Sequence, residues 1–90
     1  MTYETTTTLQ PAQVIAWAKV FFAERNPNNS AFPEKEGPNF LSLRGQGGEE
    51  IAITAISGDG ATRVRASTLF FDQALGRFFS TLPGSSESAA

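Results

Sequence analysis

Hydrophobic and polar positions change their spacing several times along the chain, and each spacing predicts a different element. Residues 2–9, TYETTTTL, alternate between two faces and are rich in β-branched threonine, so they predict a first strand. Pro11 stands where a helix can begin, because the first helical position needs no amide donor. Apolar residues then recur every three or four positions, which predicts an amphipathic helix over residues 11–25. The predicted inner face of this helix comprises Val14, Ile15, Trp17, Ala18, Phe21 and Phe22.

Residues 26–39 contain three prolines and show no usable period, so they predict an irregular connection. Phe32 is the one large apolar residue in this segment. Connections of about 4–6 residues are usual, and a longer one is expected to be either mobile or functional.

Residues 40–67 predict a three-stranded antiparallel meander, because three alternating segments are separated by the turn sequences GQGG and SGDG. A three-residue loop at 46–48 and a four-residue turn at 57–60 fix the register. The opposed pairs are then Leu41 with Ile53, Leu43 with Ile51, Ile53 with Val64, Ile51 with Ala66, Arg44 with Glu50, Thr54 with Arg63, and Ala52 with Arg65. Both turns place apolar residues on the same face of the sheet, which supports this register.

The segment STLFFDQALGRFFSTLPG predicts a second amphipathic helix, with Ser67 or Thr68 as its cap and Asp72 near its positive end. The apolar stripe of this helix comprises Phe71, Leu75, Phe78, Phe79 and Leu82. Pro83 and Gly84 end the helix, and residues 84–90 predict a disordered tail.

The predicted fold class is therefore α+β, with the element order β-α-β-β-β-α in a single domain over residues 1–83. One face of the sheet and one side of each helix are apolar. Two layers satisfy this pattern, with both helices packed on the same face of an antiparallel sheet.

Two stretches carry a resemblance to a known family. TTTTLQPAQVIAWAKVFF, in which a strand leads into a proline-started helix, and the hairpin GDGATRVRAST resemble parts of the START-like (Bet v 1, polyketide-cyclase) superfamily. The resemblance covers most of the chain and implies a shortened helix-grip fold, in a family that includes lipid binders, cyclases and assembly factors. Half of a TATA-binding-protein-like unit would have the same element order. A double-stranded-RNA-binding domain is disfavoured, because its last helix starts with lysines where this one starts TLFFDQ.

Composition excludes more chemistry than it suggests. The 90 residues include no cysteine and no histidine, which excludes disulfides, thiolate or imidazole metal sites and Ser-His or Cys-His catalysis. A net charge of −2 argues against a nucleic-acid binder. The apolar runs are shorter than the ~18 residues of a membrane span, and the N-terminus lacks a signal-peptide pattern, so a cytoplasmic protein is expected.

No catalytic residue, metal ligand or cofactor is predicted, and the favoured function is a small non-enzymatic module that binds another protein or its own copy. A homodimer is expected, because an uncovered sheet face and an outer strand favour pairing and a small chain gains buried area by self-association. The interface candidates are Phe32, Phe40, Arg44, Arg63 and Arg65. A START-like domain that holds a small apolar ligand between helix and sheet is the first alternative. Its candidate ligand-binding residues are Trp17, Phe21, Phe71 and Phe78. A cyclase or hydratase type of enzyme is the second alternative, and a nucleic-acid binder that uses the arginines is disfavoured.

Overall fold

The structure, a computed structural model, describes residues 2–24, 31–45, 47–69, 71–84 and 88–89 of the 90-residue chain. In these residues the chain forms an antiparallel sheet and two helices, which confirms the predicted α+β class. The elements are β1 (Thr2–Thr7), α1 (Pro11–Glu24), β2 (Ala31–Glu36), β3 (Phe40–Gly45), β4 (Glu50–Gly58), β5 (Ala61–Thr68), α2 (Asp72–Thr81) and the two-residue β6 (Ser88–Ala89).

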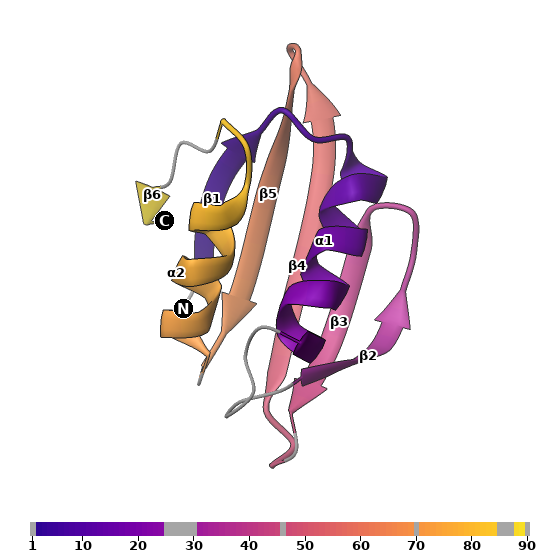
Figure 1. The fold of residues 1–90 in the computed structure, drawn as a ribbon, viewed down its shortest axis with the longest axis vertical. Coiled ribbons are helices and arrows are strands. Elements are labelled where there is room, and N and C mark those ends of the chain that lie inside the picture. The colour runs from indigo at the N-terminus through magenta and orange to yellow at the C-terminus, as the bar shows by residue number, and fades with distance from the viewer. Residues whose placement is uncertain (1, 25–30, 46, 70, 85–87, 90) are drawn as a thin grey trace.

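The two helices lie side by side on one face of the sheet, so the molecule has two layers (Figure 1). The strand order is β2-β3-β4-β5-β1-β6, and the first strand therefore lies next to the last long one. This arrangement follows from the sequence pattern, because the inward positions of β3, β4 and β5 are apolar and need a cover. The opposite face of the sheet, which we call the sheet outer face, is not covered by a helix (Figure 1).

The core lies between these layers and is built from aromatic and aliphatic side chains. The predicted inward residues of the meander and the predicted stripe of α2 are buried. The fully buried large side chains include Phe22, Phe78, Phe79, Leu41, Leu43, Ile51, Ile53, Leu75, Val14 and Val64. Thr5 and Thr7 of β1 are also buried, on the inward face that the alternation of the first strand predicts.

The two hairpins of the meander test the predicted register. Between β3 and β4, the predicted pairs Leu41–Ile53, Leu43–Ile51 and Arg44–Glu50 are all confirmed. Between β4 and β5, the predicted register is wrong by two residues: Ile53 faces Ala66, Ala55 faces Val64, Thr54 faces Arg65 and Ile56 faces Arg63.

The shift arises because the β4–β5 turn is shorter than predicted. Gly58 pairs with Ala61, which leaves only Asp59 and Gly60 in the turn. Both have positive φ, 53° and 78°, the conformation of a two-residue hairpin turn whose twist matches the strands. A shift of two residues leaves every side chain on its predicted face, since side chains alternate with a period of two.

The prediction of an irregular connection over residues 26–39 is wrong for part of that segment. Residues 31–36 form β2, which pairs with β3 at one edge of the sheet. The register shifts between Pro33 and Lys35, since proline has no amide donor for a continuous ladder. An edge strand with a proline, a bulge and charged residues resists pairing with another chain, so this edge is a poor docking site.

The start of α2 also differs from the prediction. Ser67 and Thr68 belong to β5, and the helix begins at Asp72 after an N-cap at Phe71. The Thr68 hydroxyl accepts a hydrogen bond from the Phe71 amide (3.1 Å) and donates one to the Glu50 carbonyl (3.2 Å). Thr68 therefore joins β4, β5 and the entry to α2, instead of capping the helix itself.

The tail that was predicted to be disordered, residues 84–90, lies mostly outside the described residues. Of the described part, β6 pairs with Tyr3 and Glu4 of β1, which the sequence pattern does not predict.

Candidate functional site

Three of the four predicted ligand-binding residues lie in the core. Phe78 is fully buried, and Phe21 and Phe71 are about 5% exposed. The ring of Phe78 lies 5.6 Å from those of both Phe21 and Phe22, measured between ring centroids. These rings fill the space between helix and sheet in which the ligand was expected.

Trp17 differs from the other three, and its prediction as a core residue of α1 is wrong. Its side chain is 39% exposed, on the solvent side of the helix layer. The inward stripe of α1 consists of Val14, Ile15, Ala18, Phe21 and Phe22. Trp17 stands at the margin of this stripe, where a three- and four-residue period alone does not distinguish inside from outside.

The exposed side of α1 is itself largely apolar. It consists of Ala12, Gln13, Ala16, Trp17 and Val20, and we call it the α1 outer face. None of these residues is charged, and Val20 is 50% exposed. Lys19, on the same helix, turns toward β2 instead, where its Nζ lies 3.1 Å from Glu36 Oε1. The predicted amphipathic helix therefore has apolar residues on both of its sides.

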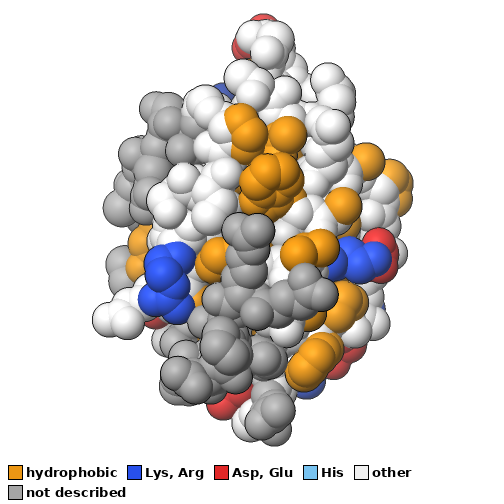
Figure 2. Space-filling model, viewed as in Figure 1, with side chains coloured by type: hydrophobic (Ala, Val, Ile, Leu, Met, Phe, Trp, Pro, Cys, Tyr) orange, Lys and Arg blue, Asp and Glu red, His pale blue; other side chains and the backbone are white. Residues whose placement is uncertain are grey.

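A hollow of about 430 Å³, open to solvent, lies along this face. Among the described residues it is lined by Leu9, Gln13, Ala16, Trp17, Val20 and Phe21, none of which has an ionisable side chain. Figure 2 shows hydrophobic side chains gathered along the middle of the helix-bearing face of the molecule. Large hydrophobic groups in contact with solvent at one place mark an interaction site more often than isolated ones do.

Hydrogen bonds fix the position of Trp17. Its indole Nε1 donates to Thr81 Oγ1 at 2.9 Å, and that hydroxyl donates to the Phe78 carbonyl at 2.6 Å. The indole is thereby linked to the last turn of α2 and is oriented before any partner arrives. Rigid, half-exposed tryptophans of this kind are frequent anchors of protein interfaces.

The five predicted interface residues share the sheet outer face. Phe40 and Arg44 are exposed alternate residues of β3, Phe32 lies opposite Arg44 on β2, and Arg63 and Arg65 are exposed on β5. The structure thus brings them to one side of the sheet, although it also shows carboxylates among them.

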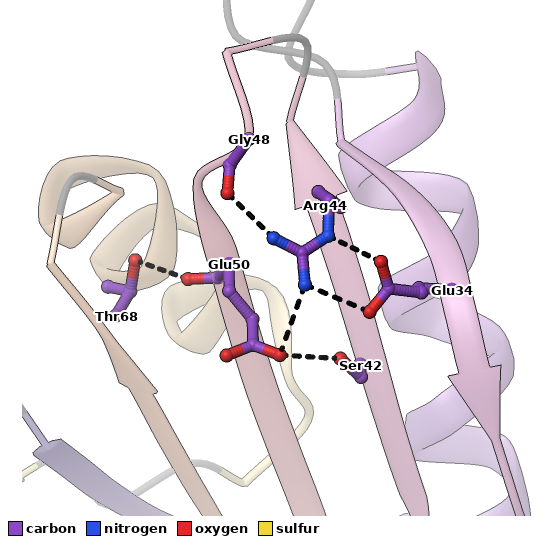
Figure 3. Close-up of polar contacts among 6 residues, drawn as sticks. All are labelled: Glu34, Ser42, Arg44, Gly48, Glu50 and Thr68. Atoms are coloured by element: carbon purple, nitrogen blue, oxygen red, sulfur yellow. Dashed lines mark hydrogen bonds and ion pairs between the residues drawn. The ribbon is translucent and has the colours of Figure 1, made fainter.

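Arg44 is the most strongly paired of the three arginines. Its guanidinium donates to both carboxylate oxygens of Glu34 and to the Gly48 carbonyl, and Glu50 Oε2 lies 3.8 Å from Nη2 (Figure 3). Glu50 also accepts a hydrogen bond from Ser42 (3.2 Å). The hydrogen bond from Arg44 lowers the pKa of Glu34, and the same contact raises the pKa of Arg44.

Arg65 and Arg63 differ in their surroundings. Arg65 Nε lies 3.6 Å from Glu4 Oε2 on the neighbouring strand β1. Arg63 makes no ion pair with a residue that the structure describes, and its cross-strand neighbours are Ile56 and Thr6. Alternating charges of this kind do not form the continuous basic surface that binding to phosphates requires.

The exposed apolar residues of the sheet outer face are dispersed. Phe32, which lies opposite Arg44, and Phe40 are toward opposite ends of β3, with the polar Ser42 between them. The Phe40 ring lies against Gly37, so close that a Cβ at this position would clash with it. Ile56 is exposed further along β4, beside Arg63. This face therefore has the composition of a solvated sheet surface.

Acid–base groups that could serve catalysis are also paired structurally. Tyr3 Oη donates to Asp72 Oδ1 at 2.8 Å, and this hydrogen bond, with burial and the nearby carboxylate charge, raises the pKa of Tyr3. The contact joins β1 to the first turn of α2. In the described part of the chain, no group of three or more acidic, cysteine or histidine residues could hold a metal ion.

The lining residues of the hollow that the sequence analysis did not single out as candidates include Leu9, Ala16 and Val20. A signal was present, since Ala12, Gln13, Ala16, Trp17 and Val20 are all uncharged. Among the described residues, no helix has the length and apolar character to span a membrane. Compared with protein-family models, with curated proteins and with solved structures, the chain finds no match.

Proposed function

We propose that this chain is a small non-enzymatic module that binds another protein through the α1 outer face. The observation that carries the proposal is that α1 is apolar on both sides. A helix with this pattern is normally buried on both sides. Among the described residues only one side of α1 has a cover, and the other presents Trp17 and Val20 to solvent.

The form of the hollow favours a protein over a small molecule. Small ligands are usually enclosed, with about 70–90% of their surface buried. This hollow is open along a helix, and among the described residues its polar side chains are those of Gln13 and Trp17. An apolar side chain of a partner, carried on a helix or a strand, would fit such an open surface without needing many polar contacts.

Two further arguments support a binding role over catalysis. The described residues that line the hollow include no ionisable side chain, so none of them could serve there as a general acid or base. Tyr3, Asp72, Arg44 and Glu34, which could provide such groups, are engaged with one another in pairs elsewhere. We propose the cytoplasm as the setting of this module.

A small apolar ligand is the second candidate, since a volume of about 430 Å³ lies within the range of ligand sites, about 300–1,000 Å³. In that case the chain would be a shortened START-like domain, a relationship that its strand–helix–sheet–helix order supports. The ligand would then lie beside Trp17 on the outside of α1, because the rings of Phe21 and Phe78 fill the interior.

The test is a peptide-display selection against the immobilised full chain, followed by mapping of amide chemical shifts with the selected peptides. We expect peptides with an aromatic or aliphatic anchor, and shift changes concentrated at Ala16, Trp17 and Val20. Binding should be lost in Val20→Glu and kept in the control Ile56→Glu on the sheet outer face.

Two outcomes would contradict this proposal. Peptides that map to the sheet outer face, around Phe40 or Arg63, would place the binding surface on the other side of the molecule. A set of small apolar compounds that shifts the same α1 amides, when no peptide does, would favour the ligand-binding candidate.

A further inference from the structure

We propose that the partner of the α1 outer face is a second copy of this chain, with the two α1 helices crossing antiparallel at Ala16. This inference rests on the proposed function, because it names the occupant of the same surface. Three properties of that surface support it: its charge, the sizes of its side chains, and the position of the hollow.

The charge argument concerns what two identical surfaces do to each other. In a two-fold contact each residue near the axis meets its own copy, so any charge there would repel itself. The α1 outer face as defined has no charged residue, whereas the sheet outer face carries arginines and glutamates that would lose their water in a contact. Since the whole chain carries a net charge of −2, an uncharged face is the one on which two copies meet with least repulsion.

The sizes of the side chains decide the direction of the helices. Ala12, Ala16 and Val20 follow one another at four-residue intervals, so they form one ridge that is small at its start and bulkier at Val20, and the same spacing continues to Glu24 at the end of α1. In a parallel pair, Val20 would meet Val20 and the two alanines at the other end would not touch. In an antiparallel pair centred on Ala16, Val20 of each copy lies over Ala12 of the other. The antiparallel arrangement therefore gives even contact along the ridge.

The hollow and Trp17 complement each other in this arrangement. Trp17 stands beside the crossing point, on the same helix whose Gln13, Ala16 and Val20 line the hollow. The two-fold axis brings each indole toward the hollow of the other copy. Because Thr81 already orients the indole, little side-chain entropy is lost when the contact forms.

The available area sets the strength of the contact. A standard interface covers about 800 Å² per partner, which is roughly a sixth of the 5167 Å² surface of this chain. A 14-residue helix is only about 21 Å long, and two crossing helices cover less than the standard area. We therefore expect a weak dimer that dissociates at low micromolar concentration.

The experiment combines sedimentation with cysteine crosslinking. Because the chain contains no cysteine, only the introduced cysteines can form disulfides. Sedimentation of the unmodified chain should show a mass that rises from 9.6 kDa toward twice that value with concentration. Under mild oxidation, Ala16→Cys should link to itself, because helices packed at about 8–10 Å bring such residues within disulfide range. A mixture of Ala12→Cys and Val20→Cys should link in the mixed pair.

The controls separate the antiparallel dimer from other arrangements. Ile56→Cys on the sheet outer face should stay unlinked, and circular dichroism should show that each variant is folded. Self-linking of Val20→Cys at the level of Ala16→Cys would mean parallel helices and would overturn the inference. A monomer at all concentrations would also overturn it, while the peptide selection would still test whether the α1 outer face binds another protein.

Discussion

The indole Nε1 of Trp17 donates a hydrogen bond to Thr81 Oγ1, 2.9 Å away, and so connects the middle of α1 to the last residue of α2. The same hydroxyl donates to the Phe78 carbonyl. A solvent-facing aromatic side chain is thus held by a backbone whose neighbouring side chains are buried in the core. Changes at Trp17 should therefore report on the surface and on the helix pair, and only weakly on the core.

The hydrogen bond itself can be measured with a double-mutant cycle of Trp17→Phe and Thr81→Val. We expect a coupling free energy of up to about 1 kcal/mol, because the bond is single and partly exposed to water. Urea denaturation of the four proteins gives this value. Thr81→Ser keeps the hydroxyl and is the matched control, which should behave like the original chain. Strictly additive losses would show that the two side chains do not interact in solution.

Truncation to alanine should distinguish the core from the α1 outer face. Phe78→Ala is expected to lower the free energy of unfolding by about 3–5 kcal/mol, since the ring is fully buried among other aromatic rings. Trp17→Ala should cost clearly less, because over a third of its side chain is exposed. Equal losses of unfolding free energy for the two variants, measured by thermal or urea unfolding, would show that Trp17 belongs to the core.

The β4–β5 turn gives a prediction with a matched control in the same loop. Gly60 has a φ of 78° and open space where a Cβ would lie. In Gly60→Ala the new methyl group therefore clashes with no neighbour, and stability is lowered only because alanine disfavours a left-handed backbone. That cost is about 1–2 kcal/mol. Gly58 has the same open space without a positive φ, and Gly58→Ala should change stability little. The prediction fails if both substitutions have the same effect on the unfolding midpoint.

The pair of Glu34 and Arg44 predicts a pH dependence. The hydrogen bond from Arg44 lowers the pKa of Glu34 below its ordinary value of 4.5. The stabilisation that the pair contributes is therefore complete above that value and is lost as the pH falls through the lowered pKa of the folded state. A carboxyl-carbon NMR titration should show a low midpoint for Glu34, which returns toward the ordinary value in Arg44→Gln. An unchanged midpoint in this variant would contradict the pairing.

Nucleic acid should not bind appreciably near physiological salt, because carboxylates of Glu34 and Glu4 accompany Arg44 and Arg65. Labelled single- and double-stranded oligonucleotides, titrated at two salt concentrations, provide the measurement. Arg63→Ala combined with Arg65→Ala should change nothing. Micromolar affinity that is lost both in high salt and in this double variant would instead identify the sheet outer face as a phosphate-binding surface.

The sequence is sufficient to predict the two layers of the fold, but it does not predict the edge strand β2. Alternation in β3, β4 and β5 assigns each side chain to a face, and that assignment survived a two-residue error in the register because an even shift preserves faces. Strand β2 is not predicted because AFPEKE shows no alternation of apolar and polar residues. This edge strand buries only Ala31, so its sequence does not have to alternate.

The candidate site was only partly predictable, for a related reason. Helical spacing groups Trp17 with Phe21 and Phe78 as aromatic residues, but it contains no information on how far around the helix the neighbouring layer extends. Only the packing of α2 beside α1 decides that Phe21 is covered and that Trp17 is not. The lack of charge at Ala16 and Val20 was visible in the sequence and would have marked the surface.

The pairing of β1 with β5 has a consequence for the order of events during synthesis. Thr2 of β1 lies opposite Ser67 of β5, so β1 cannot pair until β5 has been synthesised, about 65 residues later. At about 5–20 residues per second, that delay is roughly 3–13 seconds. An unpaired strand of Val or Ile would be prone to aggregate. The strand TYETTT has β-branched threonines, which favour a strand, and their hydroxyl groups can be solvated by water while the strand is unpaired. We therefore expect the threonines of β1 to make the nascent chain less prone to aggregate than valine or isoleucine would at the same positions.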